Sequence, residues 1–516
     1  MSQIPPEQQA PHQDPDQQGQ ENEYEEDGTN KKLIFNVVPS WIVSFVIHVA
    51  LIILLALLVI PTKREVDLAI ESSSTVNETV ENIDLDPSDF DDLEENEEEE
   101  LTETEVSEAV EVETVELVEV VETFDAPNVI SEELSFEQSD VGDLSAASSP
   151  GQVSSRTGAG KKAALRKGGG TPESEEAVEA ALKWIAKHQL PDGGWSLDHT
   201  IGKGDFRKSP NPGELADART GATALAILPF LGAGNTHLNG DYKKQVQAGL
   251  DFLKSRAQRS GRGISFTEPG GTMYSHGLAS IVLCEAFAMT QDTSLAPYAQ
   301  GSIWYIEDVQ DKVGGGWRYQ PRQQGDTSAV GWQLIALKSA KLSGLNINTN
   351  TIRGVEKFLD GVSNAEGSVY GYVAAPTGKR ISRATSAVGL LCRMYMGWDK
   401  DTPGIQNGVD FLSKRGPSTE KNSGHCNMYY NYYATQVMKH YGGDQWTNWN
   451  NQMRDYLIET QGKKGNVKGS WYLAADHAGK KGGRLYSTAL ATMTLEVYYR
   501  FLPIYKDRSA EDDFEL

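Results

Sequence analysis

The pattern of apolar positions between residues 171 and 505 predicts pairs of helices. In the first pair, apolar residues recur at the helical spacing and mark one face of an amphipathic helix. They are Val178, Ala181, Leu182 and Ile185. Thr171 and Pro172 supply a helix cap and a first-turn proline. A second, more apolar helix begins at residues 220–223 and ends near Gly232, so the two helices predict a hairpin.

Two short signatures of this hairpin return along the chain. The first helix of each pair ends on an aromatic residue followed by an aliphatic one, at Trp184, Phe252, Tyr305, Phe358, Phe411 and Tyr456. The middle four of these lie 53 residues apart. The second helix begins at a polar residue, at Thr223, Ser275, Asp326, Thr385, Asn431 and Ser487. Such a period is typical of repeat folds, whose units are too small to bury their own apolar faces.

Six such units predict an all-α domain over residues 171–505. We expect an (α/α)6 toroid of six helical hairpins. The amphipathic helices would form an outer ring and the apolar helices an inner ring, with the starts of the inner helices lining the centre.

Three of the predicted helix ends resemble the QW repeat of the terpenoid cyclase and protein prenyltransferase superfamily. Two copies span residues 181–195 and 301–317, and a looser third copy spans residues 456–471. The glutamine of this repeat bonds backbone groups in the next turn, the glycine permits a tight loop, and the tryptophan stacks on the helix end. Residues 482–500 are similar to the last repeat of bacterial membrane proteins with prenyltransferase and squalene oxidase repeats. The resemblance implies the toroid, but fold alone does not settle function.

A membrane anchor is predicted near the amino terminus, within residues 33–62. The 20 residues from Trp41 to Ile60 are broken only by Ser44 and His48, and as a helix they would cross a hydrocarbon core of about 30 Å. The run exceeds the apolar part of a signal peptide, and no small-residue cleavage site follows it. Residues 1–32 hold hardly any large apolar residue, so we expect a disordered tail there.

The orientation of this anchor is not settled by charge, because Lys31 and Lys32 on one side balance Lys63 and Arg64 on the other. Ser44 and His48 lie one helical turn apart, a spacing that resembles the Ser-x3-His of TonB-type anchors. That resemblance implies a proton-motor partner and an extracytoplasmic toroid. The alternative is that both side chains simply find partners within the membrane.

The net charge of -26 belongs to one segment of the chain. Between Glu65 and Asp143 there are 30 acidic residues and no lysine or arginine, so the rest of the chain is mildly basic. Self-repulsion favours an extended tether, and we interpret residues 63–170 as an acidic linker that ends in a glycine-rich hinge at 158–170. Residues 506–516 form a short acidic tail, and no nucleic-acid partner is expected.

Neither a metal nor a cofactor is expected. The three cysteines form no CxxC pair, so no zinc ribbon or disulfide framework is indicated. Protein prenyltransferases bind zinc through Asp, Cys and His, and here His425 and Cys426 lie side by side, with His276 or His477 as further candidates. Adjacent ligands rarely converge on one tetrahedral ion, so we favour a loop histidine and a buried cysteine.

Asp326 is the one candidate catalytic residue. The cyclases carry an Asp-x-Asp-Asp-Thr-Ala motif whose middle aspartate protonates an alkene, but the matching stretch, residues 323–328, keeps only the last aspartate. Asp326 also stands where a helix cap belongs, and capping alone is worth about 1 kcal/mol. Both interpretations stay open, and the missing carboxylates favour the cap.

Aromatic residues gather where the inner helices are predicted to start, a lining that suits an apolar, isoprenoid-like chain. We expect ligand contacts from Trp317, Tyr319, Tyr429, Tyr430, Trp471 and Arg484. Packing between helix ends would also explain the rings. The favoured hypothesis is a membrane-anchored toroid that binds an apolar ligand or a protein partner without cyclase chemistry. The alternative is an enzyme of squalene cyclase or prenyltransferase type.

Overall fold

The computed structural model describes residues 156–501 except 271, 378–380, 420–425, 474, 475 and 477. The tail at 1–32, the predicted anchor at 33–62 and the acidic tail at 506–516 lie outside these residues. Among the helices that the structure describes, none combines the length and the apolar character that crossing a bilayer requires. The anchor therefore stays a prediction.

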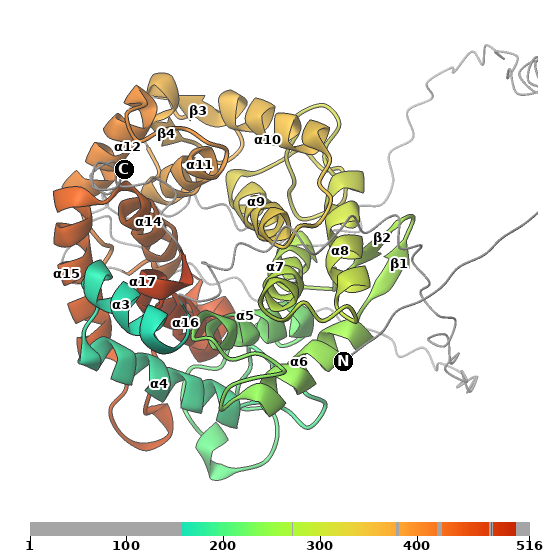
Figure 1. Ribbon diagram of the computed structural model, residues 1–516, viewed down its shortest axis with the longest axis vertical. Coiled ribbons are helices and arrows are strands. Elements are labelled where there is room, and N and C mark those ends of the chain that lie inside the picture. The colour runs from blue at the N-terminus through green and yellow to red at the C-terminus, as the bar shows by residue number, and fades with distance from the viewer. Residues whose placement is uncertain are drawn as a thin grey trace, which may run out of the picture. The chain divides into compact units, whose positions relative to one another are not determined.

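The described residues form an α/α toroid of two concentric rings (Figure 1). The outer helices are α4 (Pro172–Lys187), α6 (Lys243–Ser255), α8 (Ala296–Asp308), α10 (Thr349–Val362), α12 (Pro403–Arg415) and α15 (Gly443–Thr460). The inner helices are α5 (Arg219–Gly232), α7 (Thr272–Thr290), α9 (Thr327–Leu342), α11 (Arg383–Tyr395), α14 (Met428–Tyr441) and α16 (Gly479–Leu495). Each outer helix leads into the next inner one, which gives the predicted hairpins.

The inner ring is closed. Each inner helix packs on the next one along the chain, and α16 returns to pack on α5. The inner helices are the more deeply buried set, since nearly every residue of α5, α9 and α14 is inaccessible to solvent. Several of them begin at a polar cap: Asp326, Ser382 and Asn427 each accept a hydrogen bond from the backbone amide three residues on.

The QW motifs act as clasps between neighbouring outer helices. The Gln310 amide donates to the Gly315 carbonyl in its own turn and to the Thr351 carbonyl of α10, at 2.7 and 2.9 Å. Gln461 does the same between Gly469 and the Ala177 carbonyl of α4, at 3.1 and 2.8 Å. The clasp of Gln461 therefore joins the last outer helix to the first and helps to close the ring.

Glycine is required in the turns of these clasps. Gly469 has a φ of +90°, and a Cβ atom there would lie 2.2 Å from the Ala180 carbonyl oxygen. Gly315 has a φ of +82° and the same close approach to the Gly354 carbonyl. Only a residue without a side chain adopts this left-handed conformation so close to a neighbouring helix.

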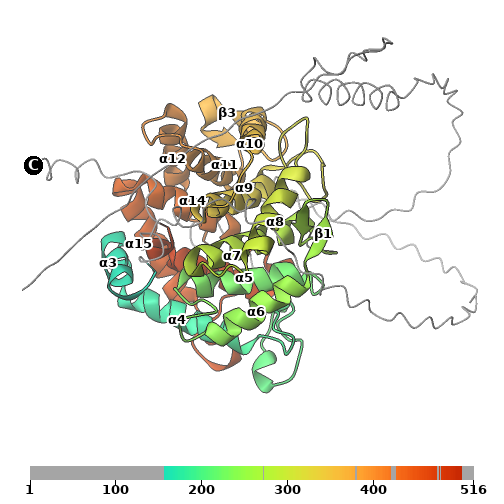
Figure 2. The same cartoon turned by 45° about the vertical axis from the view of Figure 1, so that its right-hand side comes forward.

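The amino-terminal boundary of the domain differs from the prediction. The stretch 158–170, interpreted as a hinge, contains helix α3 (Gly158–Gly168), which packs on the short α17 (Val497–Arg500). Its end is held by α15, because the Trp446 indole donates to the Gly168 carbonyl at 3.0 Å. Figure 2 shows α3 beside α15 and α4. Glycine content suggested flexibility, but tertiary packing outweighs a weak helix propensity.

Two short antiparallel strand pairs modify the all-α prediction. β1 (Gln258–Ser260) pairs with β2 (Gly263–Ser265), with Arg259 opposite Ile264. β3 (Ser363–Asn364) pairs with β4 (Val369–Tyr370). Both pairs lie between an outer helix and the next inner helix. Three-residue helices, η5 (Asp205–Arg207), η6 (Ala365–Gly367) and η7 (Gly465–Val467), occur in the loops.

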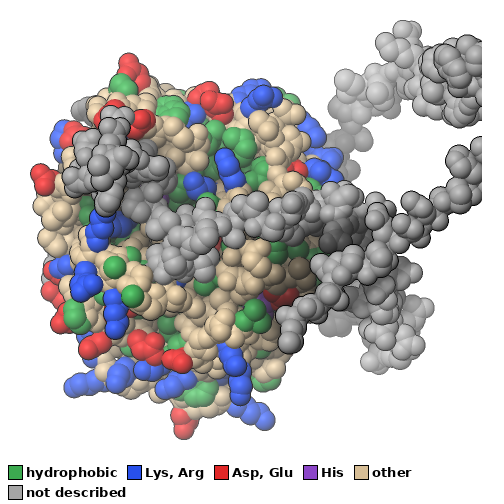
Figure 3. Space-filling view, viewed as in Figure 1, with side chains coloured by type: hydrophobic (Ala, Val, Ile, Leu, Met, Phe, Trp, Pro, Cys, Tyr) green, Lys and Arg blue, Asp and Glu red, His purple; other side chains and the backbone are tan. Residues whose placement is uncertain are grey.

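On the face shown in Figure 3, basic and acidic side chains are interspersed.

The clasp that closes the ring provides a stability test. Replacing Gln461 with Met keeps most of the side-chain volume but leaves the Ala177 and Gly469 carbonyls without their donor. We expect the free energy of unfolding to fall by about 1–3 kcal/mol, measured by urea denaturation. Gln452→Met, at an exposed position of α15, the helix that ends just before Gln461, is the matched control and should change the free energy of unfolding little. Equal effects of the two substitutions would contradict the role of the clasp.

Candidate functional site

The side chain of Trp332 identifies the face of the inner ring that points to its axis. Trp332 lies on α9, yet its ring stacks on Tyr432 of α14, with centroids 5.7 Å apart. Helix α11 stands between α9 and α14 in the ring, so the two side chains meet on the inner side. The same face of α9 carries Ser328, whose carbonyl accepts a long hydrogen bond of 3.4 Å from the Tyr429 hydroxyl.

This inward face keeps a trace of solvent exposure. On α9 the residues that retain between 3 and 8% exposure recur at helical spacing, whereas Ala329, Val330 and Ala336 are at 0%. They are Ser328, Trp332, Ile335 and Ser339, and Leu334, at 3%, is the one residue in this range that lies off the stripe. Along this stripe the axis is lined by aromatic and aliphatic side chains between two small polar ones.

Asp326 lies at the start of α9 and is completely buried. Its Oδ1 atom accepts the Ala329 backbone amide at 2.7 Å, which is the capping contact that the sequence predicts. Its Oδ2 atom has no hydrogen-bond partner among the described residues. The nearest cation to Oδ2 is Arg318, whose Nε atom is 3.9 Å away. One oxygen of this carboxyl therefore caps the helix, and the other lies near the Arg318 guanidinium.

Tyrosines from several inner-helix starts surround this carboxyl. The Tyr319 and Tyr372 hydroxyls lie 3.1 Å apart, and the ring of Tyr274 lies 5.9 Å from that of Tyr319. The Arg318 guanidinium lies over the rings of Tyr319 and Tyr372, at 5.4 and 5.5 Å. Burial, and then the Asp326 carboxyl, raise the pKa of Tyr274 well above its ordinary value, so its hydroxyl stays protonated. We call Asp326 and its tyrosines the tyrosine cluster: Tyr274, Tyr319, Tyr372 and Tyr429.

Burial raises the pKa of Asp326 from 3.8 to about 7. The Ala329 amide, the Tyr372 hydroxyl and the Arg318 guanidinium only partly oppose this effect. Asp476, close to the start of α16, is a second buried carboxyl with a raised pKa, of about 6. It accepts the backbone amides of Met428 and Ala478 at 2.8 and 3.0 Å, so both its oxygens are used. Of these two carboxyls, Asp326 is therefore the one with an oxygen that accepts no hydrogen bond from a described residue.

Two of the predicted ligand residues are packing residues. Trp317 and Trp471 are 1% and 0% exposed, and each indole donates to a carbonyl of its own outer helix, Ile306 or Leu457, at 2.8 Å. This is the stacking that the QW resemblance implies. Neither ring belongs to the tyrosine cluster.

Two further predicted residues also lie away from the cluster. Tyr430 is fully buried, and its hydroxyl donates to the Gly416 carbonyl beside α12 at 3.0 Å. Arg484 is committed to the loop of the first hairpin, where it donates to Pro210 and Asn211 at 3.1 and 3.0 Å. Of the six predicted ligand residues, Tyr319 and Tyr429 belong to the tyrosine cluster, and the binding role of all six stays a prediction.

No metal centre is found among the described residues: no three His, Cys, Asp or Glu side chains converge. Both ring nitrogens of His276 are used, one by the Phe266 amide and one by the Ser302 carbonyl, each at 3.1 Å. Cys426 is buried and free, while His425 and His477 lie outside the described residues.

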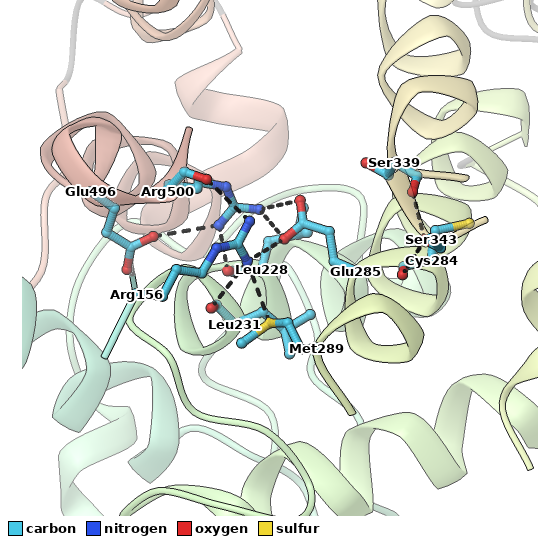
Figure 4. A network of polar contacts seen from close by, with 10 residues as sticks. All are labelled: Arg156, Leu228, Leu231, Cys284, Glu285, Met289, Ser339, Ser343, Glu496 and Arg500. Atoms are coloured by element: carbon cyan, nitrogen blue, oxygen red, sulfur yellow. Dashed lines mark hydrogen bonds and ion pairs between the residues drawn. The ribbon is translucent and has the colours of Figure 1, made fainter. Parts of the chain in front are cut away.

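The other end of the axis holds a buried ion network (Figure 4). Glu285, near the end of α7, accepts from Arg156 at 2.9 Å and from Arg500 at 3.0 Å. Arg500 also lies 3.4 Å from Glu496, whose pKa burial raises to about 8. Arg156 further donates to the Leu231 carbonyl at the end of α5. Two guanidinium groups on one carboxylate hold down the pKa of Glu285 in spite of its burial.

Sequence reasoning missed Tyr274 of the tyrosine cluster, although a signal was present. Tyr274 directly precedes Ser275, the polar residue at the start of its inner helix, and Tyr429 precedes Asn431 by two positions. Trp332 had no such signal, because only the ring geometry shows which side of an apolar helix faces the axis.

Comparison with known proteins assigns no family to this chain. No family model matches the chain, and no curated protein matches it. Among solved structures, an inactive variant of an alpha-1,6-mannanase from Salegentibacter sp. HEL1_6 covers 63% of this chain and 99% of its own, with 11% identity and a TM-score of 0.45. A type II terpene cyclase from Scytonema covers 64% and 99%, with 12% identity and a TM-score of 0.41. Cellobiose 2-epimerase from Spirochaeta thermophila DSM 6192 covers 66% and 99%, with 13% identity and a TM-score of 0.46.

The raised pKa of Asp326 predicts a pH dependence of stability. Because the folded state binds this proton more tightly than the unfolded state, the stabilising effect is present below pH 4 and is lost as the pH rises to about 7. Over this pH range the free energy of unfolding falls by about 4 kcal/mol. Asp326→Asn keeps a capping oxygen, so we expect it to remove this part of the decline and to be the more stable protein at pH 8.

Urea denaturation at pH 5 and pH 8 measures the effect. Asp410→Asn, at an exposed position of α12, is the control. Its free energy of unfolding should fall with rising pH as that of the wild type does. If the free energy of unfolding of Asp326→Asn fell with pH as steeply as that of the control, Asp326 would already be ionised in the folded protein at pH 5.

Proposed function

We propose that this protein is a membrane-anchored toroid that holds an apolar, isoprenoid-like chain along its axis without turning it over. The observation that carries this proposal is the inward-facing aromatic stripe, in which Trp332 of α9 reaches Tyr432 of α14. Aromatic and aliphatic walls suit an apolar chain, and a few polar groups at their ends fix its orientation. The tyrosine cluster supplies such groups at one end.

A cyclase-type enzyme is the second candidate, and one observation favours it. Asp326 is buried, its Oδ2 atom accepts no hydrogen bond from a described residue, and burial raises its pKa to about 7, so part of the population is protonated at neutral pH. Against it stands the local sequence, which lacks the other carboxylates of the cyclase motif. An acid with a pKa near 7 is also far weaker than protonation of an unactivated alkene needs.

The anchor completes the proposal. We place residues 41–60 in the bilayer because of their apolar run, and the toroid on the extracytoplasmic side because of the resemblance to TonB-type anchors. Ser44 and His48 would then be the contacts for a proton-driven partner. The long acidic segment between anchor and toroid suits a tether that keeps the domain away from the membrane surface.

Protease accessibility tests the topology. Protease added to intact spheroplasts is expected to digest the toroid or the segment before it, because both would be exposed at the outer surface. A cytoplasmic protein in the same cells is the control and should survive until lysis. Protection of the toroid in intact spheroplasts, with digestion only after lysis, would place it in the cytoplasm.

Ligand binding tests the function. The full-length protein should bind farnesol, and Trp332→Ala should weaken binding by about 3 kcal/mol, because it removes an enclosed aromatic wall. Trp304→Ala on outer helix α8 is the control and should bind normally. Asp326→Asn should also bind almost normally, since an amide keeps the cap. Isothermal titration calorimetry measures the affinities, and circular dichroism checks that each variant is folded.

Incubation with squalene separates the candidates. Under the proposal no cyclised product forms. A cyclised triterpene from the wild type but not from Asp326→Asn would establish the enzyme instead. Absence of farnesol binding, together with no lipid bound to the purified protein in native mass spectrometry, would point to a protein partner.

A further inference from the structure

His440 is a buried side chain whose ring nitrogens form no hydrogen bond with a described residue. It lies in the last turn of α14 and is 4% exposed, and neither ring nitrogen has a hydrogen-bond partner in the described part of the chain. Burial, and then Lys338 and Lys439, lower the pKa of His440 to about 3, so the ring is neutral. Leaving buried polar atoms unpaired is costly, and such groups occur where a ligand completes the site.

Two side chains from neighbouring inner helices face this ring. The ring of Tyr395, at the end of α11, lies 5.8 Å from that of His440, and the Lys338 ammonium of α9 lies 5.1 Å from the same tyrosine ring. The Tyr395 hydroxyl donates to the Gln436 side chain at 3.1 Å. Lys338 is half-buried and makes no ion pair with a described residue. Burial lowers its pKa, as expected for a cation without a counterion.

The nearest carboxylate is already occupied. Glu285, whose charge acts on Tyr395, is held by both Arg156 and Arg500 in the network of Figure 4. The rings of Tyr395 from α11 and of Phe501 lie beside His440, and the charges that act on it are those of Lys338 from α9 and Lys439 from its own helix. This set contains two cations and no acid. The carbonyl ends of the inner helices favour a lysine here, but they do not satisfy the His440 ring.

His440 shares one face of α14 with the tyrosine cluster. Tyr429, Tyr433, Gln436 and His440 recur at the helical spacing. From Tyr429 to His440 this face rises about 16 Å, at 1.5 Å per residue. A chain laid along the axis from the tyrosine cluster would thus reach His440 with its other end.

We propose that Lys338, Tyr395 and His440 form the binding site for the anionic head, a carboxylate, of an apolar-chain ligand. The inference rests on the proposed function, which it refines by giving the ligand a charge and a direction. The Tyr395 ring, whose hydroxyl already donates to Gln436, would pack beside the ligand head, while Lys338 would supply the counterion and the His440 ring an N–H group. These are the donors that a desolvated carboxylate needs.

Binding of such an anion is coupled to protonation. A carboxylate beside His440 stabilises the imidazolium form, which offsets the repulsion from Lys338 and Lys439 and raises the pKa of the ring. Proton uptake therefore accompanies binding, and affinity rises as the pH falls through the pKa of the bound state. Free acetate lacks the apolar chain and should bind weakly.

The test compares farnesoic acid with farnesol, which has the same chain without the charge. Titration calorimetry of the full-length protein at pH 6 should show the acid binding about tenfold more tightly or better. Lys338→Met and His440→Gln should each bring the acid close to the affinity of farnesol, while farnesol itself is unaffected. Lys341→Met, at an exposed lysine of the same helix, is the matched control and should change neither affinity.

Proton uptake separates the role of His440 from a merely structural one. Titrations in buffers of different ionisation enthalpy should show uptake with farnesoic acid, and His440→Gln should abolish it. Equal affinities for acid and alcohol, unchanged by Lys338→Met, would overturn the inference and leave the proposed function standing. Failure of both to bind would overturn both. Acetate or inorganic phosphate binding as tightly as farnesoic acid would also overturn it, because the site would then take a free anion.

Discussion

Ring closure is the constraint on which the rest of this structure depends. No hairpin of this size buries its own apolar face, so each inner helix needs a neighbour on both sides, and α5 finds its second neighbour only in α16, at the end of the domain. Gln461 bridges the same seam in the outer ring. Contacts between residues so distant in sequence form late and at high entropic cost. The domain therefore cannot be shortened by a repeat without exposing two apolar faces.

Closure also produces an axis with chemically different ends. The inner helices run in parallel, so their starts gather at one end and their carbonyl ends at the other. Polar caps collect at the starts, and there Asp326 is buried among tyrosines without a full counterion. Cations collect at the carbonyl ends, where Arg156 and Arg500 share Glu285. Between them the stripe around Trp332 is apolar. Polar and charged side chains thus lie at both ends of the axis, with apolar side chains between them.

The sequence predicts the fold better than it predicts the site. The hairpins and the Asp326 cap follow from local signals, namely the 53-residue period, the QW motifs and a polar residue at each inner-helix start. Helix α3 was not predicted because its glycine content indicates a flexible segment. Its packing on α17, which is distant in sequence, is not visible in the local pattern. Trp317 and Trp471 were interpreted as ligand residues because the sequence does not show whether a ring faces the axis or the next helix. The pairing of Arg156 with Glu285 joins residues with no related spacing, so no local pattern predicts it.

Arg156 has a mechanical consequence for the chain that precedes it. It is the first described residue, and its side chain is inserted at the carbonyl ends of the inner helices instead of lying on the surface. A force applied at Arg156 would act on the Arg156–Glu285 ion pair and on the packing of α3 on α17. The ion pair would pass this force into the inner ring at α7. The force would therefore act on the end of the axis where Glu285, Arg500 and Tyr395 lie, and not on the outer surface of the toroid.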